Sequence, residues 1–210
     1  MVTLQLCQLD IPPGQRLLIH TRDWAEFEAI LTELGEKRSS RIAYSNGRLE
    51  IRMPLPKHER AKSMIGDMIK ILLEELEMDC EYFGSITFKR QEMNYGIEPD
   101  DCFYIQNHHM MIGKERLNLA IDPPPDLAIE VDVTSKTQLE AYTRLGVPEL
   151  WIYDRTLTIY VLRSGEYQPS DRSPTFPDLP ILDWVAEALD HSGAIGRSPA
   201  LRAFRQKLRQ

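Results

Sequence analysis

The chain has 210 residues, of which 42% are hydrophobic and 27% are charged. This is the composition of an ordinary globular protein. It excludes wholesale disorder, and the length favours one domain over residues 1–210. No apolar run approaches the roughly 18 residues of a membrane span, and the first twenty residues lack the basic start and apolar stretch of a secretory signal. Three cysteines without a CxxC pair argue against a disulfide framework or structural zinc site, and favour a cytoplasmic location.

The net charge of −7 is unevenly distributed along the chain. Residues 36–62 and residues 197–210 each carry a net charge of +5, so the rest of the chain carries −17. An acidic body with two basic segments is compatible with a protein that meets phosphate at one face and holds a metal ion at another. The alternative is that both basic segments are ordinary solvated faces.

The N-terminal part of the sequence predicts a helix, a hairpin and a second helix. Thr21 is a suitable N-cap for a helix that ends at Gly35. Asn46-Gly47 lies between two short strand-like runs and is the strongest local hairpin signal, because both turn residues must accept a positive φ. Apolar positions over 57–77 follow helical spacing and predict the clearest helix of the chain.

The rest of the sequence predicts a series of strands with interspersed helices. The strand-like segments are 80–88, 101–105, 126–133, 149–153 and 156–162. The helical segments are 137–145, 182–189 and a basic one at 199–209. This order indicates an α/β or α+β domain in which a mixed sheet carries helices on its faces. Its core spans about 20–165, and a helical tail spans about 180–210.

Two acidic clusters lie at predicted strand ends, one over 98–101 and one that contains Glu130 and Asp132. Residues two apart on a strand share a face, so these two carboxylates should repel each other unless a cation lies between them or one is protonated. Carboxylate oxygens from adjacent strands suit Mg²⁺ or Mn²⁺. Lys136 follows closely and could reach the same site. The alternative is that the acids are turn or solvent-exposed residues and that Thr137 only caps the next helix.

Several motifs, in this order, give the chain a resemblance to a known family. They are NGRLEIRMPLPKHE, EPDD, PDLAIEVDVTSKT and YTRLGVPELWIYD. Over about residues 20–165 the chain resembles the Uma2 family of restriction-endonuclease-like proteins, within the PD-(D/E)XK nuclease superfamily. The resemblance implies a restriction-endonuclease-like mixed β-sheet flanked by helices. It also implies a metal-dependent endonuclease that hydrolyses phosphodiester bonds of nucleic acid, with DNA as the expected substrate.

The resemblance also assigns roles to individual residues. Asp100 and Glu130 would be the catalytic acids that ligate Mg²⁺ or Mn²⁺, and the Val131 carbonyl would be a further ligand. Glu50 would be the upstream catalytic acid. Lys136 would orient the nucleophile or stabilise the transition state. Four side chains would bind the nucleic acid without reading its sequence: Arg52, Lys57, His58 and Arg60.

The chain departs from the superfamily pattern at the lysine. Asp132 occupies the position of the motif lysine, and Gln138 occupies the position that many Uma2 relatives use instead. Lys136 is the nearby replacement. The competing hypothesis is therefore a catalytically inactive nuclease fold that acts as a nucleic-acid-binding or interaction module. We also expect a homodimer, because nucleases that cut duplex DNA often pair their active sites and because a basic tail beside an acidic body suits self-association.

Overall fold

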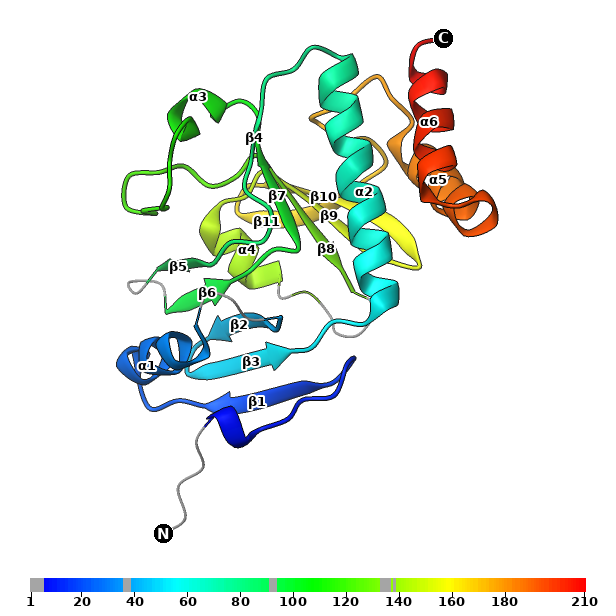
Figure 1. Cartoon of the computed structure of the whole chain (residues 1–210). Coiled ribbons are helices and arrows are strands. Elements are labelled where there is room, and N and C mark those ends of the chain that lie inside the picture. Colours follow the sequence, from blue (N-terminus) through cyan, green and yellow to red (C-terminus); the bar gives the residue numbers. More distant parts are fainter. Residues whose placement is uncertain (1–5, 36–38, 91–93, 133–136, 138) are drawn as a thin grey trace.

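The structure, a computed structural model, describes residues 6–35, 39–90, 94–132, 137 and 139–210. Its strands form two sheets (Figure 1), whereas the sequence suggested a single one. A five-stranded sheet has the order β1-β3-β2-β6-β5, and a six-stranded sheet has the order β11-β10-β9-β8-β7-β4. The second sheet is mixed, because β8 and β9 are parallel and its other pairs are antiparallel. Helices flank the sheets, which confirms the expected α+β class.

The first sheet is built around the predicted hairpin. Its strands are β1 (Arg16–His20), β2 (Arg41–Ser45), β3 (Arg48–Arg52), β5 (Phe88–Arg90) and β6 (Tyr95–Ile97). Asn46 and Gly47 form the turn with φ angles of 46° and 80°, as the Asn-Gly signal requires. Alternate residues of β3 pack against helix α1 (Trp24–Leu34). Because successive side chains alternate, Glu50 and Arg52 project from the opposite face of the sheet.

The second sheet holds most of the predicted strands. They are β4 (Glu81–Tyr82), β7 (Asp101–Tyr104), β8 (Leu127–Val131), β9 (Glu149–Asp154), β10 (Thr156–Arg163) and β11 (Glu166–Ser170). All five residues of β8 are buried, as its apolar pattern predicts for a central strand. Strands β1, β6 and β11 have no counterpart among the predicted elements, because they are three to five residues long and partly polar.

The predicted strand 80–88 is wrong, because the chain passes from one sheet to the other within it. Tyr82 ends β4 in the second sheet, and Phe88 begins β5 in the first sheet. Gly84 lies between them with a φ of 60°, a left-handed conformation that interrupts an extended strand. The chain crosses again between β6 and β7, through the link 98–100. This second link carries part of the candidate site.

Helix α2 (Pro56–Glu75) confirms the predicted long helix and lies against one face of the second sheet (Figure 1). Its inward side, which includes Met64, Ile65 and Met68, packs with residues of β8 and β9 such as Ile129 and Trp151. The helix starts at a proline, whose fixed φ suits the first helical turn. That first turn is directed toward the junction of the two sheets (Figure 1).

The shorter helices are η1 (Leu6–Gln8), α3 (His108–Met111), α4 (Leu139–Leu145), α5 (Ile181–Ile195) and α6 (Arg197–Leu208). One predicted cap is wrong: Asp23, not Thr21, caps α1, and its side chain accepts a hydrogen bond from Glu26 N. Gly35 ends that helix with a φ of 71°, as expected. Within the described part of the chain, no helix combines the length and the apolar character that a membrane crossing needs.

The basic C-terminal helix docks on the chain's own α2. Arg205 donates hydrogen bonds to Glu74 and Glu75, and Arg209 binds Glu75 through two of its nitrogens. Arg197 pairs with Asp67 further along the same helix. Acids of α2 therefore neutralise much of the positive charge of this segment.

Candidate active site

Asp100 lies at the point where the chain passes from β6 to β7, and its side chain is fixed against β8. The residue is 2% exposed. Its backbone N–H donates to Ile129 O at 3.0 Å, and its Oδ2 accepts a hydrogen bond from Val131 N at 2.9 Å. The backbone on both sides of Glu130 thus binds Asp100. The structure thus places the two predicted acids beside each other, Asp100 in the link before β7 and Glu130 on β8.

Glu130, in the middle of β8, is 1% exposed and is held by one tyrosine. The Tyr142 hydroxyl, on α4, donates to Glu130 Oε1 at 2.5 Å. Burial, reinforced by the nearby negative charge of Asp100, raises the pKa of Glu130 to about 8. At neutral pH the carboxyl group therefore keeps its proton unless further positive charge reaches it.

His58, in the first turn of α2, is directed into the site. Its Nε2 lies 2.9 Å from Asp100 Oδ2, and its Nδ1 lies 3.3 Å from Glu59 Oε1. Burial disfavours the charged imidazole, but the hydrogen bond and charge of Asp100 outweigh it and raise the pKa of His58. Burial likewise disfavours ionised Asp100, but His58 and the Val131 N–H lower the pKa of this carboxyl group. The His58 side chain is 6% exposed and is held against Asp100.

Glu50 and Arg52 extend the site across the junction from the first sheet. Arg52 Nε lies 3.6 Å from Glu50 Oε1, and Arg16 Nη1 lies 3.2 Å from Glu50 Oε2. Burial lowers the pKa of the Arg52 guanidinium, but the charges of Glu130, Asp100 and Glu50 overcome this and raise it. The Arg52 side chain is 12% exposed and lies within the site.

Asp132, at the position of the motif lysine, binds Thr137. Its Oδ2 accepts a hydrogen bond from Thr137 N at 2.8 Å, and its Oδ1 accepts one from the Thr137 hydroxyl at 2.6 Å. These two bonds connect the residue that follows β8 to Thr137. Lys136, the candidate for the lysine role, and Gln138, at the position that many relatives use for the lysine, lie outside the described residues.

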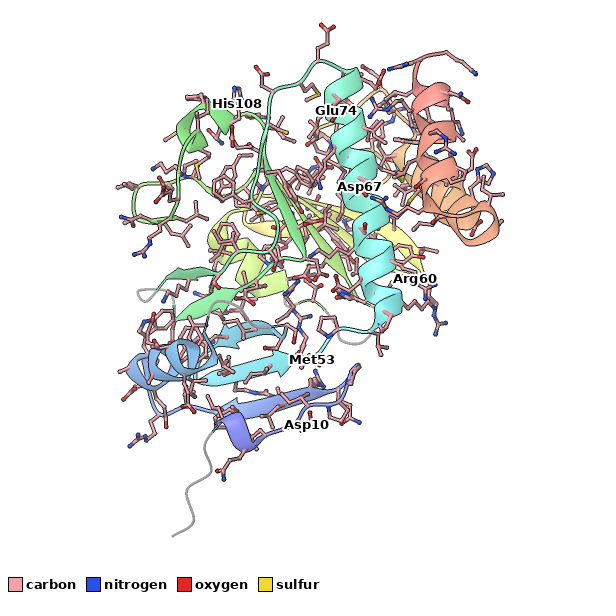
Figure 2. All side chains as sticks on the ribbon, viewed as in Figure 1. Asp10, Met53, Arg60, Asp67, Glu74 and His108 are labelled. Atoms are coloured by element: carbon pink, nitrogen blue, oxygen red, sulfur yellow. The ribbon has the colours of Figure 1, made fainter. Side chains whose placement is uncertain are left out.

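Lys57 and Arg60 are exposed on the first turns of α2, next to His58 in the sequence. Figure 2 shows Arg60 extending from α2 away from the sheets. Of the four predicted nucleic-acid-binding residues, Lys57 and Arg60 are thus exposed, whereas the side chains of Arg52 and His58 are 12% and 6% exposed.

The oxygen atoms of the acid pair fit a hard divalent cation. Each carboxylate has a second oxygen, Asp100 Oδ1 or Glu130 Oε2, to which no described residue donates a hydrogen bond. No cluster of three or more His, Cys, Asp or Glu side chains suited to a metal occurs among the described residues. Mg²⁺ commonly binds through one or two carboxylates and keeps several waters, so two acids and the Val131 carbonyl are a suitable set.

Sequence reasoning missed Tyr142 and Arg41. Arg41 Nε lies 4.0 Å from Asp100 Oδ1. A signal for Arg41 was present, because the two-residue Asn46-Gly47 turn fixes the register of the hairpin and places Arg41 opposite Arg52. Tyr142 had no such signal, because its contact with Glu130 depends on how α4 packs.

Comparisons with known proteins show the fold and the family to which the chain is similar. The chain is similar in structure to a crystal structure titled "putative nuclease belonging to DUF820" from Anabaena variabilis ATCC 29413, with a TM-score of 0.54. The two are 19% identical, and the match covers 77% of this chain and 96% of that one, so it shows a shared nuclease-like fold. The model of the Uma2 family, described as "Putative restriction endonuclease", matches residues 24–189. The chain belongs to the Uma2 family. Among curated proteins no significant match is found.

Proposed function

We propose that the chain is a metal-dependent endonuclease that hydrolyses phosphodiester bonds of nucleic acid, with DNA as its substrate. One observation supports the proposal: Asp100, in the link before β7, is hydrogen-bonded to the backbone on both sides of Glu130, on β8, and both residues are buried. Membership of a family described as "Putative restriction endonuclease" supports the same activity. Ionising Glu130 beside Asp100 is unfavourable unless a cation compensates the second negative charge.

Asp100, Glu130 and the Val131 carbonyl would hold Mg²⁺ or Mn²⁺. When bound, the cation supplies positive charge to the phosphoryl oxygens and makes a water molecule more acidic. The protein's own part is to fix these ligands. His58 holds Asp100 through Oδ2, and Tyr142 holds Glu130 through Oε1. In both cases the second oxygen accepts no hydrogen bond from a described residue.

The remaining predicted residues complete the proposal. Lys136 orients the attacking water or stabilises the transition state. Glu50 acts on the site through its contact with Arg52. Lys57 and Arg60, on the exposed first turns of α2, bind backbone phosphates beside the acid pair without reading sequence. The cytoplasmic location inferred from cysteine usage belongs to the same proposal.

A cleavage assay tests this function. Purified protein is incubated with supercoiled plasmid and with single-stranded DNA, with Mg²⁺, Mn²⁺ or EDTA, beside Glu130→Ala. We expect cleavage that needs the divalent cation and is lost in the variant. If the wild-type protein binds DNA but cleaves neither substrate with either cation, the inactive binding module is the correct reading. A folded Glu130→Ala variant that still cleaves would end the catalytic assignment of Glu130.

We also propose a homodimer, on the ground that nucleases acting on duplex DNA often use paired sites. The second ground, the free basic tail, no longer applies, because Arg205 and Arg209 are paired with acids of α2 in the same chain. Light scattering at micromolar concentration, with and without a duplex oligonucleotide, checks the oligomeric state. A monomer under both conditions would contradict the proposal.

A further inference from the structure

Three arginines lie side by side across the first sheet. In the antiparallel register, Arg52 on β3 is opposite Arg16 on β1 and opposite Arg41 on β2. Directly opposed residues project from the same face of a sheet, so the three side chains share the face that carries Glu50. Like charges in this arrangement destabilise a sheet unless anions face them. This row of three arginines therefore requires negative charge at the junction between the two sheets.

The protein's own acids meet this requirement only in part. Glu50 lies between Arg16 and Arg52, at 3.2 and 3.6 Å. Arg41, in contrast, faces Asp100 Oδ1 at 4.0 Å, which is beyond hydrogen-bond distance. Arg41 Nε is buried and has no hydrogen-bond acceptor among the described residues. The side chain of Arg41 is 19% exposed, so part of this side chain, which lies near Asp100, is accessible to solvent.

This missing acceptor contrasts with the buried carboxylate of Glu149, whose two oxygens both accept hydrogen bonds, from Trp151 and from Thr175. A buried guanidinium N–H without an acceptor is unfavourable, and an anionic oxygen would satisfy it. The donor lies beside the acid on which the proposed reaction depends.

We propose that Arg41 and Arg52 form a phosphate-binding pair that contacts the non-bridging oxygens of the phosphodiester being cleaved. The inference rests on the proposed endonuclease function and names the residues that receive its substrate. Guanidinium groups suit this role, because their planar N–H donors match the oxygens of a phosphate and remain charged. Their position next to Asp100 and Glu130 places positive charge where negative charge increases in the transition state.

A role as simple counter-ions for the acids makes a different prediction. Removing a counter-ion leaves the acid pair more negative, so the affinity for a divalent cation should stay equal or rise, and cleavage at saturating cation should be kept. Removing a side chain that binds the phosphate of the substrate has the same effect on cation affinity, but it slows cleavage. Two measurements together therefore separate the two roles.

The experiment uses the full chain with Arg41→Gln, Arg52→Gln, and the lysine variants at both positions. Arg48→Gln is the matched control, because Arg48 is an exposed arginine at the other end of β3. Mn²⁺ affinity is measured by electron paramagnetic resonance without DNA. Cleavage rates are measured at saturating Mn²⁺ and DNA, and folding is checked by circular dichroism.

We expect each glutamine variant to cleave about 100-fold more slowly than wild type, with Mn²⁺ affinity unchanged or higher, whereas Arg48→Gln behaves as wild type. Glutamine variants that fold and cleave within threefold of the wild-type rate would overturn the inference. If they fail to fold, the lysine variants decide: cleavage about tenfold slower supports the inference, and wild-type cleavage overturns it. A wild-type protein that cleaves nothing would overturn the proposed function itself, and this inference with it.

Discussion

His58 Nε2 and Asp100 Oδ2 are 2.9 Å apart, which connects the first turn of α2 to the link between the two sheets. The same oxygen accepts the N–H of Val131 from β8. Three elements that are distant in the sequence therefore meet at one carboxylate. A substitution in any of these three elements should therefore affect the site more than the fold as a whole.

Replacing His58 with alanine should weaken both the fold and the site. The variant leaves a buried carboxylate without its strongest partner, and we expect a loss of about 2 kcal/mol in the free energy of unfolding. Mn²⁺ affinity should fall about tenfold or more, because the orientation of Asp100 is no longer fixed. Isothermal titration and chemical denaturation measure the two effects. Lys57→Ala, an exposed neighbour, is the control and should change neither.

The stability that His58 supplies should depend on pH. Its pKa is raised above 6.5 in the folded protein, so the folded state binds the proton more tightly than the unfolded state. The contribution is then complete below pH 6.5 and is lost as pH rises through the raised pKa. The difference in unfolding free energy between wild type and His58→Ala should shrink over this range. A difference that grows with pH would contradict the assignment.

Glu130→Gln should leave the metal-free protein as stable as wild type or more stable. The pKa of Glu130 is about 8, against 4.5 for an ordinary glutamate, so ionisation of this buried group opposes folding. In EDTA, the stability of the wild-type protein should therefore fall as pH rises from 4.5 toward 8, and the stability of the variant should fall less. Thermal denaturation of both proteins from pH 5 to pH 9 measures this difference. A glutamine variant that unfolds at neutral pH would mean that Glu130 is structural.

Tyr142→Phe removes one hydroxyl and tests whether the orientation of Glu130 matters. We expect Mn²⁺ affinity to fall about tenfold, because an outer-shell hydrogen bond to a ligand is lost while the packing of the ring remains. Tyr104→Phe is the matched control: Tyr104 is also fully buried, and its hydroxyl binds the Pro123 carbonyl oxygen instead. Equal Mn²⁺ affinity in the two variants would show that the Tyr142 bond has no part in cation binding.

The features that sequence could predict are those with local signals. The Asn46-Gly47 pair predicted the hairpin, the spacing of apolar residues predicted α2, and the apolar residues around Glu130 predicted β8. The division into two sheets was missed, because the chain crosses between the sheets at Gly84 and at the link 98–100. The sequence at these two places fits a continuous strand equally well. The acids of the candidate site could be named from motifs. His58 was also named, but with a different role, and Tyr142 was missed, since both reach the acids only through the packing of two helices.

A last prediction concerns Gly66, in the middle of α2. A Cβ atom at this position would lie 2.5 Å from Asp101 Oδ2, which is closer than real contacts allow. Asp101 cannot move freely, because its Oδ1 accepts a hydrogen bond from the Tyr82 hydroxyl at 2.6 Å and the residue is 2% exposed. Alanine normally stabilises a helix by about 1 kcal/mol relative to glycine. Here the clash should reverse the sign.

We therefore expect Gly66→Ala to lower the free energy of unfolding by about 1–3 kcal/mol, the usual cost of overpacking. Because Asp101 follows Asp100 directly, cleavage should fall as well. Gly193→Ala, in helix α5, is the matched control: nothing lies within 4 Å of its Cβ position, so the same substitution should stabilise the protein. Urea denaturation of both variants measures the two shifts. Stabilisation by Gly66→Ala would mean that Asp101 is not held against α2, and the close approach of this helix to the site would have to be reconsidered.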